Sequence, residues 1–459
     1  MFRISLSDDG TILAVGQPYY DNNLGLVETF LWENGDWVKL GRDILGESAG
    51  SQLGYTVGLT GDASMLAVGA HGADKVLFYD LVEFFPSSVP SMNPSISAAP
   101  TVLPTLLPSS SPTMQPSSTL RPSLNPTKLP SFSPSFLPSV IPTVLPSSFP
   151  SSLPTFNPSL LPTSIPNVLY VKNDARTLVG GPGLSFGFNF ALTSDGSRII
   201  VGAEYANAND GAFFSYEDSG TTWQFYDPTM GQVGPPGTRV GFGKYVDISA
   251  DGNKVATGTV YFDSGGLSNN GYANVWSYSG SGWSQLGSSI FGDSSNAKIG
   301  YHVKISDDAT RFITGSKSYL GSNGAAQVFL FNSDSNDWDQ LGTDIRGDQA
   351  NDGFGNVFAM SGDGSTVAIT SDGDRKYIWV LYYNESQSDW VLKGAQLDLP
   401  GTAYKSESLW LNNDGSQFAY SAYNSGVDGF VRVLNWEEIN SAWVQKGSDI
   451  SQIENDYSG

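Results

Sequence analysis

Few side chains in this 459-residue sequence are of types that perform covalent or metal chemistry, because it has two histidines and no cysteine. Without cysteine there is no disulfide framework, no cysteine-ligated zinc site, no thiol nucleophile and no tyrosine–cysteine copper cofactor. His71 and His302 could supply at most one pair of metal ligands, and we interpret each as a structural or surface residue. No Gly-x-Ser-x-Gly elbow precedes a helix, and no phosphate loop or nucleotide fingerprint is present. We therefore predict no catalytic residue, no metal and no cofactor.

Aspartate and asparagine side chains are the remaining candidates, and they gather in a set of recurring loops. Loops held on a rigid scaffold usually carry function, and carboxylate and amide groups hydrogen-bond to both proteins and sugars. The alternative interpretation is a set of solvated turns in an acidic protein. The predicted partner- or glycan-binding residues are Asp21, Asn22, Asn23, Asn207, Asn209, Asp210, Asp263, Asn269, Asp372, Asp374, Asn424 and Asp428.

These loops belong to a unit that repeats through most of the chain. Each unit has a short strand ending in Ser or Thr, an Asp-Gly-like turn, a strand of small apolar residues, a loop, an aromatic strand, a tight turn and a last strand that usually opens with Trp. The turn aspartates lie 51–57 residues apart once an 81-residue low-complexity tract is subtracted from the one longer interval. They are Asp9, Asp62, Asp195, Asp251, Asp308, Asp363 and Asp414.

Four short strands per unit at this period are the signature of a β-propeller. Asp-Gly supplies the positive φ that a tight turn needs, so we assign the turn aspartates to structure and the repeated Trp to packing between blades. We predict an all-β fold, a seven-bladed β-propeller with four-stranded antiparallel blades. Because the chain begins and ends in mid-pattern, a ring closed by its two ends competes with a window cut from a longer array.

A Pro/Ser/Thr-rich insertion interrupts the repeats at residues 86–166. It holds 20 of the 26 prolines, and 19 of these are followed by Ser or Thr. Proline at this density removes backbone donors and forbids helix and inner strand, so we predict a disordered or extended spacer, with an O-glycosylated element as the sharper alternative.

The insertion falls between the third and fourth strands of the second unit and therefore divides the propeller. The predicted domains are blades 1 and 2 (first part) in 1–85, the tract in 86–166, and the end of blade 2 with blades 3–7 in 167–459. The rival interpretation is a linker between two separate propellers.

The units resemble FG-GAP-like repeats of the integrin α-head type in Gly241-Phe242-Gly243, Asp251-Gly252 and Trp283–Gly292. They are more similar to long propeller-repeat surface proteins predicted in diatoms and related algae, which also carry Pro/Ser/Thr-rich tracts. The resemblance consists of structural positions, so it implies the fold more than an activity. The calcium-binding form of this hairpin is similar to D-x-[DN]-x-D-G-x-x-D, whose last ligand is missing in every unit, so calcium is not expected in these turns.

The net charge of the chain and its sequence features bear on its partners and its location. The chain has 45 acidic and 23 basic side chains and a net charge of −22, which argues against nucleic-acid binding. No secretory leader or membrane span is visible, and the sequence is compatible with N-terminal truncation. The resemblance and the tract favour an extracellular or cell-surface location, where Asn384, in the only sequon that proline does not block, is a candidate for N-glycosylation.

We predict a monomeric, non-catalytic interaction or adhesion module that presents an acidic, Asn/Asp-rich propeller face to a protein or polysaccharide partner. A structural cell-wall or matrix protein is the alternative. A propeller glycosidase or lyase that uses acidic loop residues is less favoured.

Overall fold

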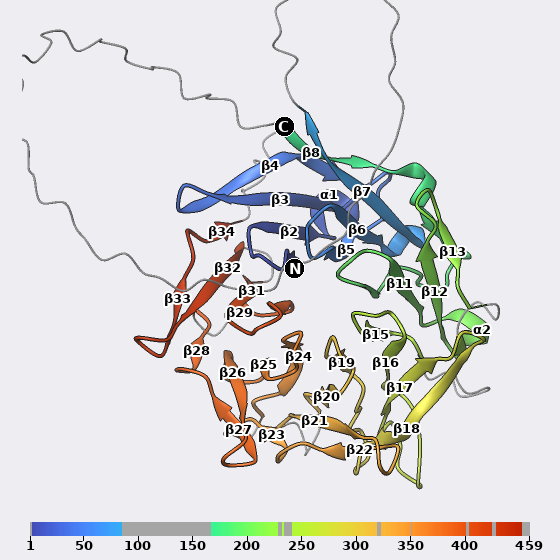
Figure 1. The fold of residues 1–459 in the computed structure, drawn as a ribbon, viewed down its shortest axis with the longest axis vertical. Helices are drawn as coiled ribbons and strands as arrows, with labels where there is room; N and C mark the ends of the chain where they lie inside the picture. The colour runs from blue at the N-terminus through green and yellow to red at the C-terminus, as the bar shows by residue number, and fades with distance from the viewer. Residues whose placement is uncertain are drawn as a thin grey trace, which may run out of the picture. The chain divides into compact units, whose positions relative to one another are not determined.

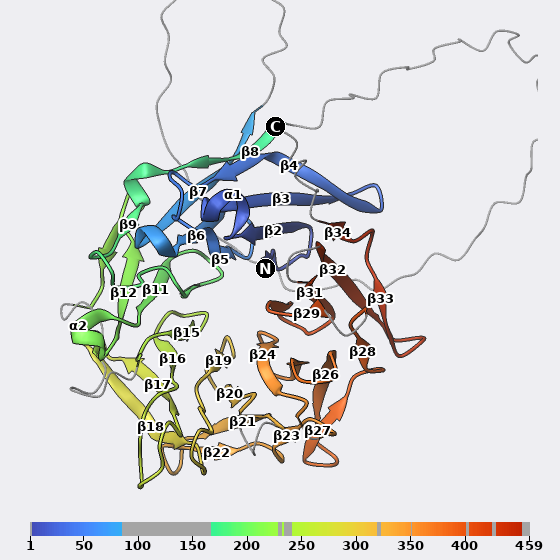
Figure 2. The same cartoon turned by 180° about the vertical axis from the view of Figure 1, so that it is seen from behind.

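The structure is a computed structural model that describes residues 2–84, 167–227, 232–233, 241–318, 323–349, 351–400, 404–424 and 428–451. Met1–Phe85 and Pro166–Gly459 make one compact unit, in which seven antiparallel sheets follow one another around a central axis (Figures 1 and 2). This confirms the predicted all-β fold, a seven-bladed propeller of four-stranded blades. The predicted disorder and O-glycosylation of residues 86–166 lie outside the described residues.

Blades 1 to 3 are built from strands that pair in sequence order, the first at the axis and the fourth at the rim. Blade 1 contains β1 (Arg3–Leu6), β2 (Ile12–Gln17), β3 (Leu26–Glu33) and β4 (Asp36–Leu45). Blade 2 contains β5 (Leu53–Leu59), β6 (Met65–Ala70), β7 (Lys75–Phe84), β8 (Asn167–Lys172) and the short β9 (Leu178–Val179). Blade 3 contains β10 (Phe190–Leu192), β11 (Arg198–Ala203), β12 (Ala212–Asp218), β13 (Trp223–Phe225) and β14 (Gln232–Val233).

Blades 4 to 7 repeat this order. Blade 4 contains β15 (Tyr245–Ile248), β16 (Lys254–Thr259), β17 (Tyr272–Tyr278) and β18 (Trp283–Phe291). Blade 5 contains β19 (His302–Ile305), β20 (Arg311–Ser316), β21 (Ala325–Asn332), β22 (Asp337–Gln340) and β23 (Ile345–Arg346). Blade 6 contains β24 (Phe354–Met360), β25 (Thr366–Ser371), β26 (Tyr377–Asn384), β27 (Asp389–Leu392) and β28 (Leu397–Asp398). Blade 7 contains β29 (Tyr404–Lys405), β30 (Leu409–Leu411), β31 (Gln417–Asn424), β32 (Asp428–Glu437), β33 (Ala442–Gln445) and β34 (Ile450–Ser451).

The helical segments of the described residues are single turns in loops: α1 (Tyr20–Asn23), α2 (Ala206–Asn209) and the 3₁₀ turns η1 (His71–Ala73) and η2 (Asp174–Arg176). The tight turn between the first and second strand of each blade is held by its aspartate. In blade 1 the Ser7 hydroxyl donates to Asp9 Oδ1 at 2.6 Å, which also accepts the Thr11 N–H at 3.0 Å. The same pair of bonds recurs in blades 2 to 6, at Asp62, Asp195, Asp251, Asp308 and Asp363. The structural assignment of these aspartates is confirmed.

Glycines let adjacent blades approach closely near the axis. A Cβ on Gly258 of β16 would lie 2.0 Å from the carbonyl oxygen of Gly300, which precedes the first strand of the next blade. Gly300 itself has a φ of +85°, a conformation that favours glycine. The pairs Gly16–Gly54, Gly69–Gly187 and Gly202–Gly243 meet in the same way. One glycine of each pair lies on the second strand of a blade, and the other lies at the start of the next blade. The two recurring glycines of the unit therefore contact each other across the boundary between blades.

The Trp residue that recurs in most units forms a second contact between blades, at the rim. Trp338 of blade 5 donates from Nε1 to the carbonyl of Leu286 in blade 4 at 2.9 Å, and its ring covers Gly287. Asp337 accepts the N–H of Ser288 at 2.6 Å. The equivalent Trp donors are Trp390 to Leu341 and Trp443 to Lys393. The predicted packing role of these Trp residues is confirmed, and the indole N–H adds a hydrogen bond to it.

Blade 1 meets blade 7 through the same contacts that join internal neighbours. Trp37 donates from Nε1 to the carbonyl of Lys446 at 3.0 Å, and Asp36 accepts the N–H of Ser448 at 2.8 Å. One apolar cluster spans the junction, with Phe2, Ile4, Leu6, Leu13, Val15 and Phe30 from blade 1 and Ala419, Val431 and Val433 from blade 7. No strand is exchanged between these two sheets among the described residues, so side-chain packing closes the ring.

The tract lies between two strands of one blade. β7 ends at Phe84, β8 begins at Asn167, and these two residues are partners in the antiparallel register. The chain therefore leaves blade 2 and returns to it, as predicted for an insertion between third and fourth strands.

The Trp contact can be isolated by comparing two buried indoles. We expect Trp390→Phe to lower the free energy of unfolding by about 1–2 kcal/mol more than Trp223→Phe does, measured by urea denaturation. Trp390 and Trp223 are 8% and 7% exposed, so both variants lose the same apolar area, but Trp223 Nε1 has no hydrogen-bond partner. Equal losses in the two variants would contradict a stabilising role for the indole N–H.

Candidate functional site

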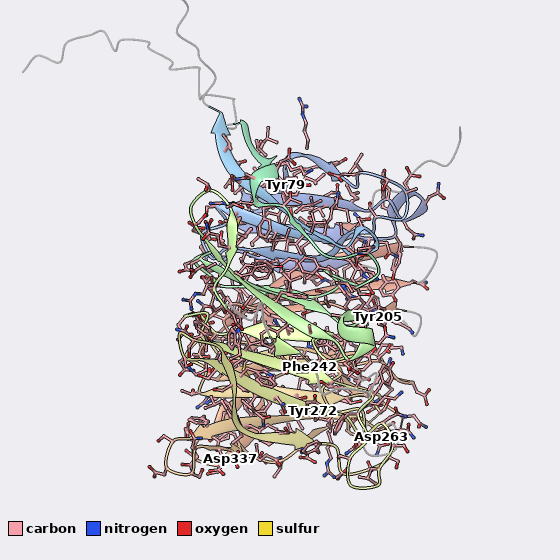
Figure 3. All side chains as sticks on the ribbon, turned by 90° about the vertical axis from the view of Figure 1, so that its right-hand side faces the viewer. Tyr79, Tyr205, Phe242, Asp263, Tyr272 and Asp337 are labelled. Carbon is pink, nitrogen blue, oxygen red and sulfur yellow. The ribbon has the colours of Figure 1, made fainter. Side chains whose placement is uncertain are left out.

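Two sets of loops alternate between the faces of the ring, because the strands of each blade are antiparallel. Second-to-third-strand loops and the loops that enter the next blade share one face, which we call the loop face. The first-to-second and third-to-fourth turns share the other, the turn face. Figure 3 shows the ring edge-on, with Tyr205 and Asp263 at the loop face and Asp337 towards the turn face. Since β7 and β8 meet at a third-to-fourth connection, the tract departs from the turn face.

The predicted Asp and Asn residues lie in or beside the second-to-third-strand connections of their blades: Asn424 ends β31, Asp428 begins β32, and the others lie in the connections themselves. Their backbone makes contacts between blades. The carbonyl of Asn23 accepts the N–H of Gln52 at 2.8 Å, and the carbonyl of Asn269 accepts that of Lys298 at 3.1 Å. Asn23 and Asn269 have φ values of +61° and +49°, a region that Asn tolerates better than most residues. A structural reason for asparagine in these loops is therefore present.

The side chains in this set have different surroundings. Asp21, Asn22, Asn23, Asn209, Asp263 and Asp374 are exposed, and Asp210, Asn269 and Asn424 are partly buried. The side chains of Asn207 and Asp428 lie outside the described residues. Among the set's described side chains, Asp372 alone lines a cavity at the axis. The binding role of the others stays a prediction.

The cavity at the axis opens among the beginnings of the first strands, on the loop face. It has a volume of about 530 Å³, within the usual range of small-ligand sites. Four aromatic rings from successive blades form one side of it: Tyr55, Phe188, Tyr245 and Tyr301, each partly buried. Their centroids are 4.8, 6.4 and 5.5 Å apart from one neighbour to the next. We call this row the aromatic arc.

Charged side chains from blades 5, 6, 7 and 1 line the cavity as well, and Arg3 and Lys317 lie 5.7 and 5.9 Å from the ring centroids of Tyr55 and Tyr301. Lys317 lies 3.0 Å from Asp372, which is also 3.9 Å from Lys405. Arg3 donates to the backbone carbonyl of Glu407 at 2.5 Å and lies 4.0 Å from its carboxylate. We call these five residues the charged arc. Burial alone would lower the pKa of Lys317, but its hydrogen bond to Asp372 outweighs this and raises it, so Lys317 stays cationic.

Two carboxylate oxygens of the charged arc have no hydrogen-bond partner. They are Asp372 Oδ1 and Glu407 Oε2. The Asp372 side chain is 10% exposed and that of Glu407 20%, and the other oxygen of Glu407 accepts the Tyr423 hydroxyl. Lys376 and Lys405 lie 3.7 and 3.9 Å from Asp372 Oδ1, and Arg3 lies 4.0 Å from Glu407 Oε2. These contacts are ion pairs longer than hydrogen bonds, so both oxygens could still accept from an external donor.

Both histidines pack against rings of the aromatic arc, and His302 also lines the cavity. The His302 ring is 5.6 Å from Tyr245 and 4.8 Å from Phe358, and burial, with Lys304 and Arg3 nearby, lowers its pKa to about 3. The His71 ring is 5.0 Å from Tyr55 and 5.2 Å from Phe188, and burial lowers its pKa too. Both imidazoles are therefore predominantly neutral at neutral pH.

The axial residues could have been found from one feature of the repeat. Tyr55, Phe188, Lys244 and Tyr301 each follow the glycine of a Phe-Gly-like element, and each lines the cavity. The sequence reasoning used that glycine for fold only. Lys317 and Lys405 follow no such rule, because they come from different positions of their units.

The turn-face end of the axis is acidic. A smaller cavity of about 190 Å³ is lined there by Asp8, Asp247 and Asp307. Burial raises the pKa of Asp307, and the nearby charges of Asp247 and Asp8 add to the effect. The turns are joined in this region by backbone bonds between blades, such as Asp8 N–H to the Gly61 carbonyl at 2.9 Å and Asp307 N–H to the Gly362 carbonyl at 2.7 Å.

The glycosylation candidate is also on the turn face. Asn384 ends β26 in a third-to-fourth turn, where Glu385 and Ser386 are exposed. Its Oδ1 accepts the N–H of Ser386 at 3.0 Å. Within the described residues, no helix is long and apolar enough to cross a membrane, and no group of three or more His, Asp or Glu side chains is placed to hold a metal ion.

Comparisons with known proteins found similar solved structures. The chain is similar to a proposed 6-phosphogluconolactonase from Bacteroides uniformis, with 9% identity, a TM-score of 0.50 and 96% of each chain covered. It is also similar to Kuenenia stuttgartiensis hydrazine synthase (11% identity, TM-score 0.49, 97% of this chain and 95% of that one) and to the β-propeller domain of Myceliophteria thermophila Cps50 (Swd1) (10%, 0.49, 92% of each). At this identity, the likeness to the Bacteroides protein shows the fold alone. No protein-family model matches this sequence, and no curated protein matches it.

Adjacent aspartates at the turn face should respond to pH with opposite signs. The raised pKa of Asp307 means that its charge opposes folding above its folded pKa, and that this cost is absent below about pH 3.8, the unfolded value. We expect Asp307→Asn to stabilise the protein at pH 7 by about 0.5–1 kcal/mol, a modest value because the group is partly solvated, with no gain at pH 3.5.

Asp308→Asn is the matched control. Burial would raise the pKa of Asp308, but hydrogen bonds from Thr310 and Ser306 outweigh it and lower the pKa, so its contribution is present above pH 3.8 and is lost as the pH falls. This variant should destabilise the protein at pH 7. Thermal unfolding at pH 7 and 3.5 measures both, and a shift of the same sign at pH 7 would contradict the assignment.

Proposed function

We propose that this protein is a non-catalytic interaction module of the cell surface or extracellular matrix, which binds a glycan or protein partner on its loop face. The observation that carries the proposal is the axial cavity, where an aromatic arc adjoins a charged arc on a rigid ring. Such a combination of apolar surface and a few convergent polar groups is typical of a ligand site. The Asp/Asn loops around it would enlarge the contact area for a larger partner.

The state of the ionisable groups favours binding over catalysis. A general acid or base works best with a pKa near the operating pH, whereas His302 has a pKa of about 3. Asp372 lies 3.0 Å from Lys317, with Lys376 and Lys405 within 4 Å, so this carboxylate is engaged in ion pairs within the protein.

The proposed location rests on other features. The composition of residues 86–166 is typical of surface spacers, and the units resemble FG-GAP-type and algal surface repeats. Asn384 ends β26 at a third-to-fourth turn, so an N-glycan attached there would project from the turn face and away from the loop face.

Glycosylation tests the location. We expect native protein to carry an N-glycan at Asn384, detected as a mass increase of the peptide that contains it and removed by peptide-N-glycosidase. Asn125, whose sequon proline blocks, is the internal control and should stay unmodified. An unmodified Asn384 together with an intracellular distribution of the native protein would contradict the proposed location.

Binding without turnover tests the function. The full chain should be retained by at least one glycan on an array or by one purified extracellular protein, and should release no products from a polysaccharide panel over hours. Release of oligosaccharides that is abolished by Asp372→Asn would instead identify a glycosidase or lyase. A structural wall protein would bind no soluble partner and would stay in the insoluble wall fraction.

A further inference from the structure

We propose that the axial cavity binds an uncharged sugar unit, whose hydroxyl groups donate to Asp372 Oδ1 and Glu407 Oε2 while its C–H face packs on the aromatic arc. This inference rests on the proposed function and gives its ligand a chemical class and a position. The sugar can be free or the terminal unit of a longer glycan, since the cavity opens on the loop face.

The two oxygens without hydrogen bonds define what the ligand must supply. Asp372 Oδ1 and Glu407 Oε2 are largely buried acceptors. Their cationic neighbours are Lys376 and Lys405 at 3.7 and 3.9 Å from Asp372 Oδ1 and Arg3 at 4.0 Å from Glu407 Oε2, so each oxygen lacks a donor at hydrogen-bonding distance. A ligand that restores the missing bonds must present at least two donors. Both carboxylates act electrostatically on Lys317 and on Tyr423, so they face the same region, and one polyhydroxylated ring can reach both.

The charges around these oxygens select against ions. Every cation of the cavity wall already has a carboxylate within 4.0 Å, including Lys244 with Glu204 at 2.8 Å and Lys304 with Asp247 at 2.9 Å. An anionic ligand would have to displace these partners in a protein whose net charge is −22. A metal ion or an amine would be placed among ammonium groups that repel it. Hydroxyl groups meet neither penalty and bond to ammonium and carboxylate alike.

The aromatic arc supplies the complementary surface. Tyr55, Tyr245 and Tyr301 are partly buried, so part of each side chain remains accessible. Burial raises the pKa of Tyr55 and, together with the neighbouring Tyr301, that of Tyr245, so both hydroxyls stay protonated. Arg3, Lys244 and Lys317 lie 5.7, 5.0 and 5.9 Å from the ring centroids of Tyr55, Phe188 and Tyr301. The apolar C–H face of a pyranose would pack on the ring surface that these cations leave uncovered, and its polar edge would meet the charged arc.

The test compares acceptors inside and outside the cavity. Full-length protein is titrated calorimetrically with glucose, galactose, mannose and xylose and with their β-linked disaccharides. We expect one sugar to bind, and Asp372→Asn and Glu407→Gln to weaken it about tenfold each. Asp334→Asn, at an exposed residue in the third-to-fourth turn of blade 5 on the turn face, should leave affinity unchanged. A disaccharide that binds more tightly than its monosaccharide would identify a chain end as the natural ligand.

A second measurement does not depend on the variants being folded. Hydrogen exchange of the wild-type protein, with and without the sugar, should show protection in peptides that cover Tyr301–Ile305 and 404–409, and none in the exposed turn at 333–336 on the turn face. Binding that survives both cavity variants, or protection confined to the outer loops, would overturn the cavity site while leaving the proposed function intact. Binding of charged glycans or of a protein alone would do the same. Failure to bind any glycan or extracellular protein would overturn both.

Discussion

The approach of one backbone to the next, glycine to glycine, determines how this ring is built. Gly258 and Gly300 leave no room for even one additional carbon atom between their blades, and the same holds at Gly16, Gly69 and Gly202. Because adjacent blades are so close near the axis, they diverge towards the rim, and large side chains must fill the wider gap there. The recurring Trp residues fill it, as Trp338 does where its ring covers Gly287. Each unit thus has small residues near the axis and large residues at the rim because blades around a common axis are close at the centre and far apart at the edge.

The features that could be predicted from the sequence are those in which the same residue type recurs at the same place in every unit. The Asp-Gly turns and the Trp positions recur in this way, so both the period and the number of blades followed from them. The axial residues do not recur as a type, since Tyr55, Phe188, Lys244 and Tyr301 share a position but not a chemistry. Lys317 and Lys405 approach Asp372 only because three separate blades converge on the axis, which no pattern within one unit reveals.

The distribution of charge separates the two ends of the axis. The loop-face cavity holds five cations and the carboxylates that pair with them, whereas the turn-face end holds Asp8, Asp247 and Asp307 with Lys304 reaching towards them. The predicted acidic, Asn/Asp-rich character of the loop face therefore describes its outer loops and not its centre. A partner approaching this face would meet acidic and amide groups first, and afterwards an aromatic centre in which five cations share four carboxylates.

The junction between blades 1 and 7 repeats the internal junctions at the rim, through the Trp37–Lys446 and Asp36–Ser448 bonds. It differs from them in having the Phe2 ring against Gly429, since the glycine pairs named above all lie between blades 1 and 5. Because the rim bonds use groups that most blades carry, they do not by themselves distinguish blade 7 of the same molecule from another blade. The high effective concentration of blade 7 beside blade 1 in one chain favours the closed ring.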